Sequence, residues 1–258
     1  MESPFKEVNT FHYFSTGFQQ KTENIILEQP VDISVNGKKW QTLICTPFDL
    51  EYFAVGLAFN EGLVKSYQDV KLVEVCHNGK NVDLWLNHVV RLPRSWTRTS
   101  GCAGGMTTRK KALSIKQIGP KGKLSPKIIT SAMENLLMSQ TIYTSTGGIH
   151  SSALHDGKNL LVAMEDIGRH NTLDKVAGYC LKESRFPPLS IILSTGRVSS
   201  EMVQKSSKIG ASFIVSRTGT SALAVEMAQE LGICLIGYCR KDRFIAYTHN
   251  AFIDNIDF

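Results

Sequence analysis

Cys102 is the residue whose surroundings best suit nucleophilic chemistry. Gly101, Gly104 and Gly105 lie beside it, and residues 98–106 repeat with neither a helical nor a strand period. A thiol reacts as its thiolate, and nearby cations lower the pKa of a cysteine. A cysteine on such a loop is therefore a candidate nucleophile. The alternative is a buried structural cysteine within a surface loop.

The sequence around Cys102 supplies many cations. No acidic residue falls between Asp83 and Glu134. The interval contains these basic residues: Arg91, Arg94, Arg98, Arg109, Lys110, Lys111, Lys116, Lys121, Lys123 and Lys127. The run favours a thiolate at Cys102 and would also attract a phosphate-bearing ligand, a nucleic acid or an acidic protein. A merely solvated basic surface is the alternative.

Two junctions have the composition of anion-binding loops. Residues 194–200 and 216–221 each follow an apolar run and combine glycine, hydroxyl residues and one arginine, Arg197 or Arg217. Free N–H groups at a helix N-terminus bind anions, and a glycine such as Gly196 lets the backbone come close. The pair predicts a phosphate or nucleotide site, with ordinary helix capping as the alternative.

A third junction, residues 144–152, has a similar composition and ends near His150, which suits either a structural or a functional role. In open α/β sheets, such loops gather outside the carboxyl ends of the strands. The chain has neither a Walker A motif nor a G-x-G-x-x-G motif. Its ligand is therefore not expected to sit on a standard nucleotide loop.

Residues 165–175 form the densest polar cluster in the chain. Polar groups between a buried strand and its helix must pair with one another or bind something, because burial removes their water. Asp166, Arg169, His170 and Asn171 are candidates to hold a polar ligand, with His170 also a possible acid or base oriented by Asp166. A capping and salt-bridge network that fixes the helix is the equal alternative.

The whole-chain composition is that of a globular protein. The 258 residues are 42% hydrophobic and 20% charged, with a net charge of +6, and no apolar run approaches a membrane span. The N-terminus lacks a secretory apolar region, so a cytoplasmic protein is expected. The remaining cysteines show no CxxC pair and predict neither a disulfide framework nor a zinc site: Cys45, Cys76, Cys180, Cys234 and Cys239.

Patterning divides the chain into an arm and two parts. Residues 1–23 are polar and irregular, which predicts a weakly ordered arm. Residues 24–124 are β-rich, with hairpin turns at 36–37 and 78–79 and a helix expected to begin at Thr46.

Residues 125–258 alternate apolar strands with amphipathic helices, as α/β domains do. Strands are expected near 160–164, 189–193, 212–215 and 234–238, and helices from Ser125 and near 171–182, 199–209 and 221–231. The predicted fold class is α/β, or α+β overall, with a smaller β-rich N-terminal part.

Several motifs in order resemble the FdhD/NarQ family of formate dehydrogenase accessory sulfurtransferases. They are residues 146–154, 165–171 with 174–175, 195–202 and 216–226, within a resemblance that runs from about 24 to about 249. The resemblance implies a three-layer α/β domain related to cytidine deaminases and a homodimer. The zinc motifs of those deaminases, HxE and PCxxC, are missing, so no metal held by the protein itself is expected.

The family resemblance also implies a chemistry. Similar proteins carry sulfur as a cysteine persulfide from a cysteine desulfurase to the molybdenum bis-guanine-dinucleotide cofactor, which is then inserted into formate dehydrogenase. The sulfur-carrying loop of the family contains CxxC. In this sequence Cys102 stands at the first position and Gly105 at the second.

The guanine-dinucleotide contact segment of the family matches a stretch near the C-terminus. Its members are Tyr238, Cys239, Arg240, Lys241, Asp242 and Arg243. Ile245 stands where many relatives have asparagine. With Gly196, Arg197, Arg217 and His170, this stretch makes up the expected cofactor-binding set.

The sequence therefore predicts a sulfurtransferase with Cys102 as the persulfide carrier. A non-catalytic chaperone that keeps the molybdenum cofactor and docks on apo formate dehydrogenase is the alternative. RNA binding through the basic run lacks stacking aromatics other than Trp96. Neither nucleic acid nor membrane is expected as a partner.

Overall fold

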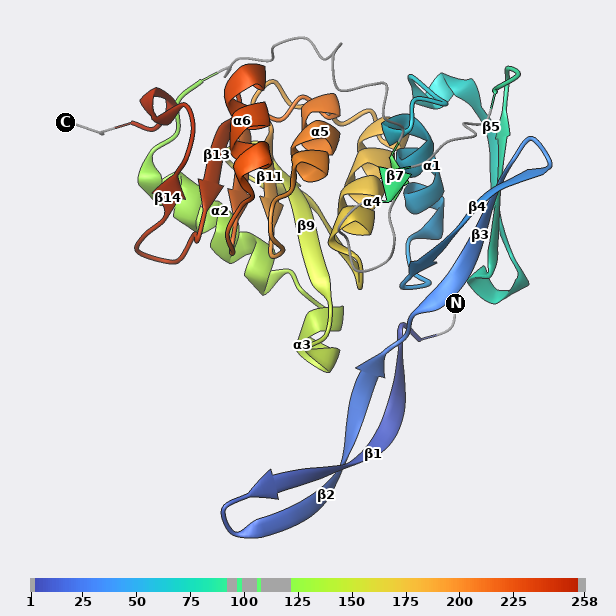
Figure 1. Cartoon of the computed structure of the whole chain (residues 1–258), viewed down its shortest axis with the longest axis horizontal. Helices are drawn as coiled ribbons and strands as arrows, with labels where there is room; N and C mark the ends of the chain where they lie inside the picture. Colours follow the sequence, from blue (N-terminus) through green and yellow to red (C-terminus); the bar gives the residue numbers. More distant parts are fainter. Residues whose placement is uncertain (1–2, 92–96, 99–105, 108–121, 255–258) are drawn as a thin grey trace.

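The computed structural model describes residues 3–91, 97–98, 106–107 and 122–254, and Figure 1 shows their arrangement. These residues form an α/β lobe, a smaller β-rich lobe and a projecting hairpin. No described helix combines the length and apolar character needed to cross a bilayer.

The α/β lobe is built on a six-stranded sheet with the strand order β10-β9-β11-β12-β13-β14. The strands are β9 (His150–His155), β10 (Leu160–Asp166), β11 (Ile191–Ser194), β12 (Phe213–Ser216), β13 (Cys234–Gly237) and β14 (Ile245–Ala246). Strands β11, β12 and β13 are parallel, whereas β9 runs antiparallel to both β10 and β11. Their short apolar runs are buried because helices cover both faces of the sheet.

Helices form the outer layers of this lobe (Figure 1). Helix α2 (Pro126–Met138) packs on one face, and α4 (Arg169–Lys182), α5 (Ser200–Lys208) and α6 (Ala222–Leu231) pack on the other. A short helix, α3 (Ile142–Thr146), links α2 to β9. The predicted three-layer α/β architecture is confirmed.

The smaller lobe consists of a four-stranded sheet and one helix. The strands are β3 (Gln29–Val35), β4 (Lys38–Cys45), β5 (Val70–Cys76) and β6 (Asn81–Leu86), in the order β4-β3-β6-β5, and α1 (Leu50–Asn60) covers one face. Asn36 and Gly37 both have positive φ, as the predicted two-residue turn requires. Short 3₁₀ turns lie at Tyr67–Asp69, His77–Gly79 and Asn250–Phe252, and β7 (Thr97–Arg98) pairs with β8 (Met106–Thr107).

Helix α1 joins the two lobes by packing against α4. Their backbones meet at Gly56 and Gly178, where an added Cβ would lie 1.7 Å from the Asp174 carbonyl oxygen and 1.9 Å from the Tyr52 carbonyl oxygen, respectively. Only glycine permits this approach. The predicted helix start at Thr46 is wrong: α1 begins at Leu50, because the backbone and hydroxyl groups of Thr46 bond to the α/β lobe instead.

The prediction of a weakly ordered arm at residues 1–23 is also corrected. The segment forms a regular antiparallel hairpin of β1 (Phe5–Phe14) and β2 (Gly17–Ile26), which projects from the body in Figure 1. Its paired residues are mostly polar and exposed, so its sequence has no apolar stripe to reveal a strand. Three aromatic side chains near the tip are about 70% exposed: Phe11 (71%), Tyr13 (70%) and Phe18 (73%).

Candidate functional site

The predicted junctions meet at one edge of the six-stranded sheet. Because β10, β11, β12 and β13 point the same way, their carboxyl ends lie together, beside the amino end of antiparallel β9. Within this edge Asp166 pairs with His150, and Ser194 is flanked by Ser152 and Ser216. The strand order thus brings together segments that are far apart in the sequence.

A cleft of about 800 Å³ opens at this edge. Tyr143, within α3, lines the cleft with Gly147 and Gly148, which lie between α3 and β9. His150, Thr195 and Arg217 also line it. Sequence patterning identified His150 and Arg217. It did not identify Tyr143, which reaches the cleft only because α3 interrupts the connection between α2 and β9.

Backbone hydrogen bonds connect the loops after β11 and β12. The N–H of Val198 donates to the Gly219 carbonyl at 3.1 Å, and the N–H of Ser221 donates to the Val198 carbonyl at 3.1 Å. Ser199 and Ser221 also accept hydrogen bonds from the first turns of α5 and α6. These two hydroxyl residues therefore cap helices, which is the ordinary role that the sequence left open for them.

Gly196 and Arg197 occupy different environments in the first of these loops. An added Cβ at Gly196 would lie 3.0 Å from Cβ of Arg169 and 3.3 Å from Nδ1 of His150, so the glycine is needed for close packing. Arg197 is exposed. Unlike Arg217, it is not one of the residues that line the cleft.

The loop after β13 is hydrogen-bonded to the loop after β12. Arg217 donates from Nη1 to the Cys239 carbonyl at 3.3 Å, and Arg240 donates to the carbonyls of Arg217 and Cys239. Tyr238 adopts φ 50°, and an added Cβ at Gly219 would lie 2.7 Å from its hydroxyl oxygen. Arg217 thus combines a place in the cleft with a structural bond.

The residues of the predicted contact segment 238–243 differ in their exposure to solvent. Tyr238, Lys241, Asp242 and Arg243 are exposed, and Arg240 is half-buried. Cys239 is fully buried in the core under α2, where burial raises its pKa to about 11. The thiol of Cys239 therefore supports the loop from inside.

Asp166, a candidate ligand residue, is instead the centre of a structural network. Its carboxylate accepts from Lys175 at 2.7 Å, Asn171 at 2.8 Å, the Gly168 N–H at 2.8 Å and the Thr46 N–H at 3.2 Å. Asp166 and Lys175 are both fully buried. For Asp166 and Asn171 the structure therefore favours the network alternative, and that network ties the two lobes together.

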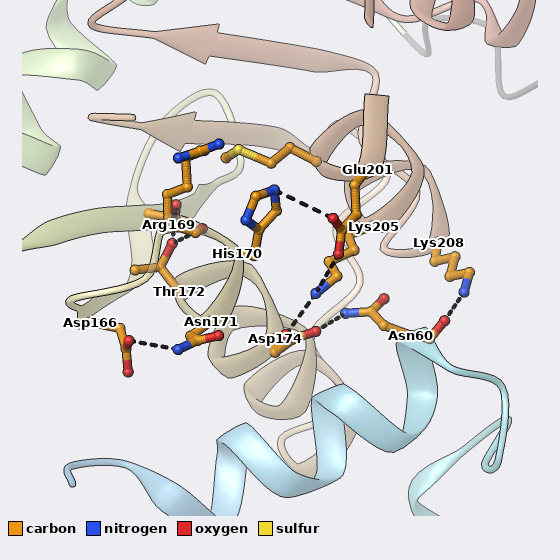
Figure 2. A network of polar contacts seen from close by, with 12 residues as sticks. Asn60, Asp166, Arg169, His170, Asn171, Thr172, Asp174, Glu201, Lys205 and Lys208 are labelled. Carbon is orange, nitrogen blue, oxygen red and sulfur yellow. Dashed lines mark hydrogen bonds and ion pairs between the residues drawn. The ribbon is translucent and has the colours of Figure 1, made fainter. Parts of the chain in front are cut away.

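His170 lies in a second network between α4 and α5, shown in Figure 2. Its Nε2 is 3.1 Å from Oγ of Ser199 and 3.5 Å from Oε2 of Glu201, while Lys205 bonds Asp174 at 2.7 Å. Burial, aided by the charges of Lys205 and Arg169, lowers the pKa of His170 to about 3. The imidazole is therefore neutral near pH 7. It is not one of the residues that line the cleft.

Cys102 and the central part of the basic run lie outside the described residues. Among the described cysteines, burial raises the pKa of Cys45 above its usual range and those of Cys180 and Cys234 to about 12. Thiols in such surroundings remain protonated and inert at neutral pH. Those three cysteines and Cys239 are thus parts of the core, which leaves Cys102 and the partly buried Cys76 as candidate nucleophiles.

Comparisons with known proteins agree with this architecture. The model of the FdhD/NarQ family matches residues 26–254. Sulfur carrier protein FdhD of Bacillus subtilis is 33% identical over 239 residues, which cover 88% of this chain and 89% of the relative. Its namesake from Staphylococcus haemolyticus is 32% identical, with 89% of each chain covered.

A solved structure shows the same fold. The crystal structure of a putative formate dehydrogenase accessory protein from Desulfotalea psychrophila superposes with a TM-score of 0.81 at 26% identity. The match covers 97% of this chain and 100% of that one. Sequence and structure together show that the chain belongs to the FdhD/NarQ family.

Proposed function

We propose that this protein is a sulfurtransferase that supplies sulfur to the molybdenum cofactor during the maturation of formate dehydrogenase. Relatives named sulfur carrier proteins and the formate dehydrogenase accessory protein support this role. The observation that carries it is the convergence of the glycine- and arginine-containing junctions on one cleft of about 800 Å³. A cleft of that size, with Arg217 and backbone groups of glycine-containing loops in its lining, suits a phosphate-bearing cofactor.

Cys102 is the proposed sulfur carrier. Its thiolate attacks the terminal sulfur of a persulfide on a cysteine desulfurase, forming a new S–S bond while the donor's S–S bond breaks. The desulfurase cysteine leaves as its thiolate, so the exchange needs no external oxidant or reductant. One sulfur suffices for this step, and Gly105 in place of a second cysteine does not prevent it.

The molybdenum bis-guanine-dinucleotide cofactor is the proposed substrate, held through its nucleotide parts at the cleft. Arg217, in the cleft, and the exposed Arg197 and Arg243 suit its phosphates. Tyr238 is half exposed and suits a flat base. A metal belongs to this substrate; among the described residues, no group of histidine, cysteine and acidic side chains could hold a metal ion.

Its proposed partners are a cysteine desulfurase, formate dehydrogenase and a second copy of the chain, in the cytoplasm. The hairpin β1–β2 supports the homodimer. Among the described residues it pairs with no third strand, and two-stranded sheets are marginally stable when left alone in water. The four charges of the hairpin, on Lys6, Glu7, Lys21 and Glu23, cancel, so two copies can meet there without repulsion.

Replacement of Cys102 by Ala tests the proposed chemistry. Wild-type protein incubated with a cysteine desulfurase and cysteine should gain about 32 Da on Cys102, the mass of one sulfur atom. The Ala variant should gain none and should fail to activate formate dehydrogenase in cells that lack the wild-type protein. Cys76→Ala is the matched control, because Cys76 is partly buried in β5, and it should behave as wild type.

Full activation by the Cys102→Ala variant would contradict sulfur carriage. It would favour the alternative, a non-catalytic chaperone that holds the cofactor and docks on apo formate dehydrogenase.

A further inference from the structure

Arg169 is a buried cation without a counter-charge among the described residues. It is the first residue of α4 and is 6% exposed, its Nε makes no hydrogen bond, and no described carboxylate lies within ion-pair distance. Burying an unpaired guanidinium is unfavourable, because the charge loses its water. A residue kept in this state calls for a compensating anion.

The acidic groups near Arg169 already have other partners. Asp166 forms an ion pair with Lys175 and accepts a hydrogen bond from Asn171. Glu201 lies beside His170 and Lys205. The carboxylate of Glu165 accepts from the backbone of residues 141–143 at about 3 Å. In Figure 2 the guanidinium lies on the side of the helix end that faces away from Asp166 and Asp174.

The groups around Arg169 are all suited to an anion. The first turn of α4 and the first turn of α5 meet there through the contact of His170 with Ser199 at 3.1 Å. These helices have 14 and 9 residues, and their N-termini carry partial positive charge. Burial lowers the pKa of His150 and of His170, and the charge of Arg169 adds to both shifts, so the two imidazoles stay neutral near pH 7.

Gly196 connects this position to the cleft. Its missing side chain leaves room for Cβ of Arg169 and Nδ1 of His150, which lie 3.0 and 3.3 Å from where a Cβ would be. His150 and Thr195, the neighbour of Gly196, line the cleft itself. Arg169 therefore lies directly behind the cleft wall.

We propose that Arg169 binds a phosphate group of the nucleotide ligand, as the buried anchor of the cleft. The nature of the ligand rests on the proposed function, whereas the need for an anion rests on Arg169 alone. A guanidinium offers two parallel donors to a phosphate, and the low polarity of the site strengthens both bonds.

Calorimetric titration with inorganic pyrophosphate and with GDP tests the assignment. Arg169→Gln should weaken the binding of both probes by roughly ten- to a hundredfold. Arg169→Lys should weaken it less, because lysine keeps the positive charge but lacks the two parallel N–H donors of the guanidinium. Arg185→Gln is the matched control, because Arg185 is exposed just beyond the other end of α4, and it should bind as wild type.

Melting temperature separates binding from structure. The unliganded Arg169→Gln variant should melt at or above the wild-type temperature, because an uncompensated charge has been removed. A lower melting temperature would show that Arg169 has a structural partner and would overturn the proposal.

The remaining outcomes distinguish the two proposals. Unchanged GDP binding by Arg169→Gln would overturn the role of Arg169 and leave the sulfurtransferase proposal intact. Binding of pyrophosphate that depends on Arg169, without binding of GDP, would support the anion anchor and contradict a guanine nucleotide. If the wild-type protein binds neither probe, the anchor and the nucleotide site are both wrong.

Discussion

Glu61 illustrates how single buried charges respond to pH. It is the C-cap residue of α1 and is 6% exposed, close to the charges of Lys205, Asp174 and Lys208. Burial is the main cause that raises its pKa from 4.5 to about 7. The folded protein therefore holds a proton on Glu61 over a pH range in which the unfolded chain has lost it.

The sign of the effect follows from proton binding. Between about pH 4.5 and 7 the folded state binds more protons at Glu61, so this group makes the free energy of unfolding fall as pH rises. His170 acts in the opposite direction. Its pKa is lowered to about 3 in the folded protein, so between pH 3 and 6.5 the unfolded chain binds more protons at this residue. The contribution of His170 to the free energy of unfolding is therefore complete above pH 6.5 and is lost as the pH falls towards 3.

We expect Glu61→Gln to gain stability relative to wild type as pH rises from 5 to 8. The amide keeps the shape of the protonated carboxyl but has no charge to bury, and the difference should grow by roughly 1–3 kcal/mol. Differential scanning calorimetry at half-unit pH steps measures it. Glu230→Gln, at an exposed position in α6, is the control; a pH-independent difference for Glu61→Gln would contradict the raised pKa.

At the residue scale, the sequence predicted residue types better than their roles. His150 and Arg217 were named from composition, and both line the cleft. For the cluster 165–175 the sequence does not decide between ligand binding and a structural network, because the choice depends on which partners the fold supplies. Asp166 meets Lys175 and the backbone of Thr46, whereas Arg169 meets no acid among the described residues.

At the scale of elements, the contact of α1 with α4 depends on two glycines. Gly56→Ala should destabilise the protein by about 3 kcal/mol or more, because its Cβ would meet the Asp174 carbonyl oxygen at 1.7 Å. Alanine gains only about 1 kcal/mol over glycine in helix propensity, so the clash decides the sign.

Chemical denaturation measures this effect. Gly148→Ala is the control, because its Cβ would meet nothing closer than 3.5 Å and the residue does not have positive φ. A Gly56→Ala variant as stable as the control would mean that the two helices can move apart freely.

The elements that the sequence predicted best are those with a strong local signal. The apolar runs of β10, β11, β12 and β13 and the amphipathic α4, α5 and α6 lie within a few residues of their predicted bounds. Strand β9 was not predicted, because its residues 150–155 mix histidine, serine and alanine and are buried only once the neighbouring strands and helices pack around them. The start of α1 was missed because Thr46 bonds across to the other lobe.

The whole molecule extends beyond its body through the hairpin β1–β2 (Figure 1). Tyr13 pairs with Phe18 across the hairpin, and Phe11 lies two residues away on the same face. An exposed aromatic patch of this kind is typical of an interaction surface. In the homodimer we propose, the second copy covers this patch.

Replacing Phe11, Tyr13 and Phe18 together by Ser should therefore convert a dimer to a monomer in light scattering. The melting transition of the body should change little, because these side chains contribute nothing to either core. Val89→Ser, at a position that is 95% exposed and away from the hairpin, is the control. If the triple variant keeps the molar mass of a dimer in light scattering, the hairpin is not part of the dimer contact.

The union of the two lobes also determines the order in which the chain can fold. The N–H of Thr46 bonds Asp166, 120 residues later, and the core of the smaller lobe includes Leu181 from α4. Translation of the roughly hundred residues between β6 and the end of α4 takes about 5–20 s at 5–20 residues per second. During that interval α1, which is buried on nearly every side in the finished protein, has no helix to pack against. The amino-terminal lobe is therefore the part of the nascent chain that most needs protection by a chaperone during synthesis.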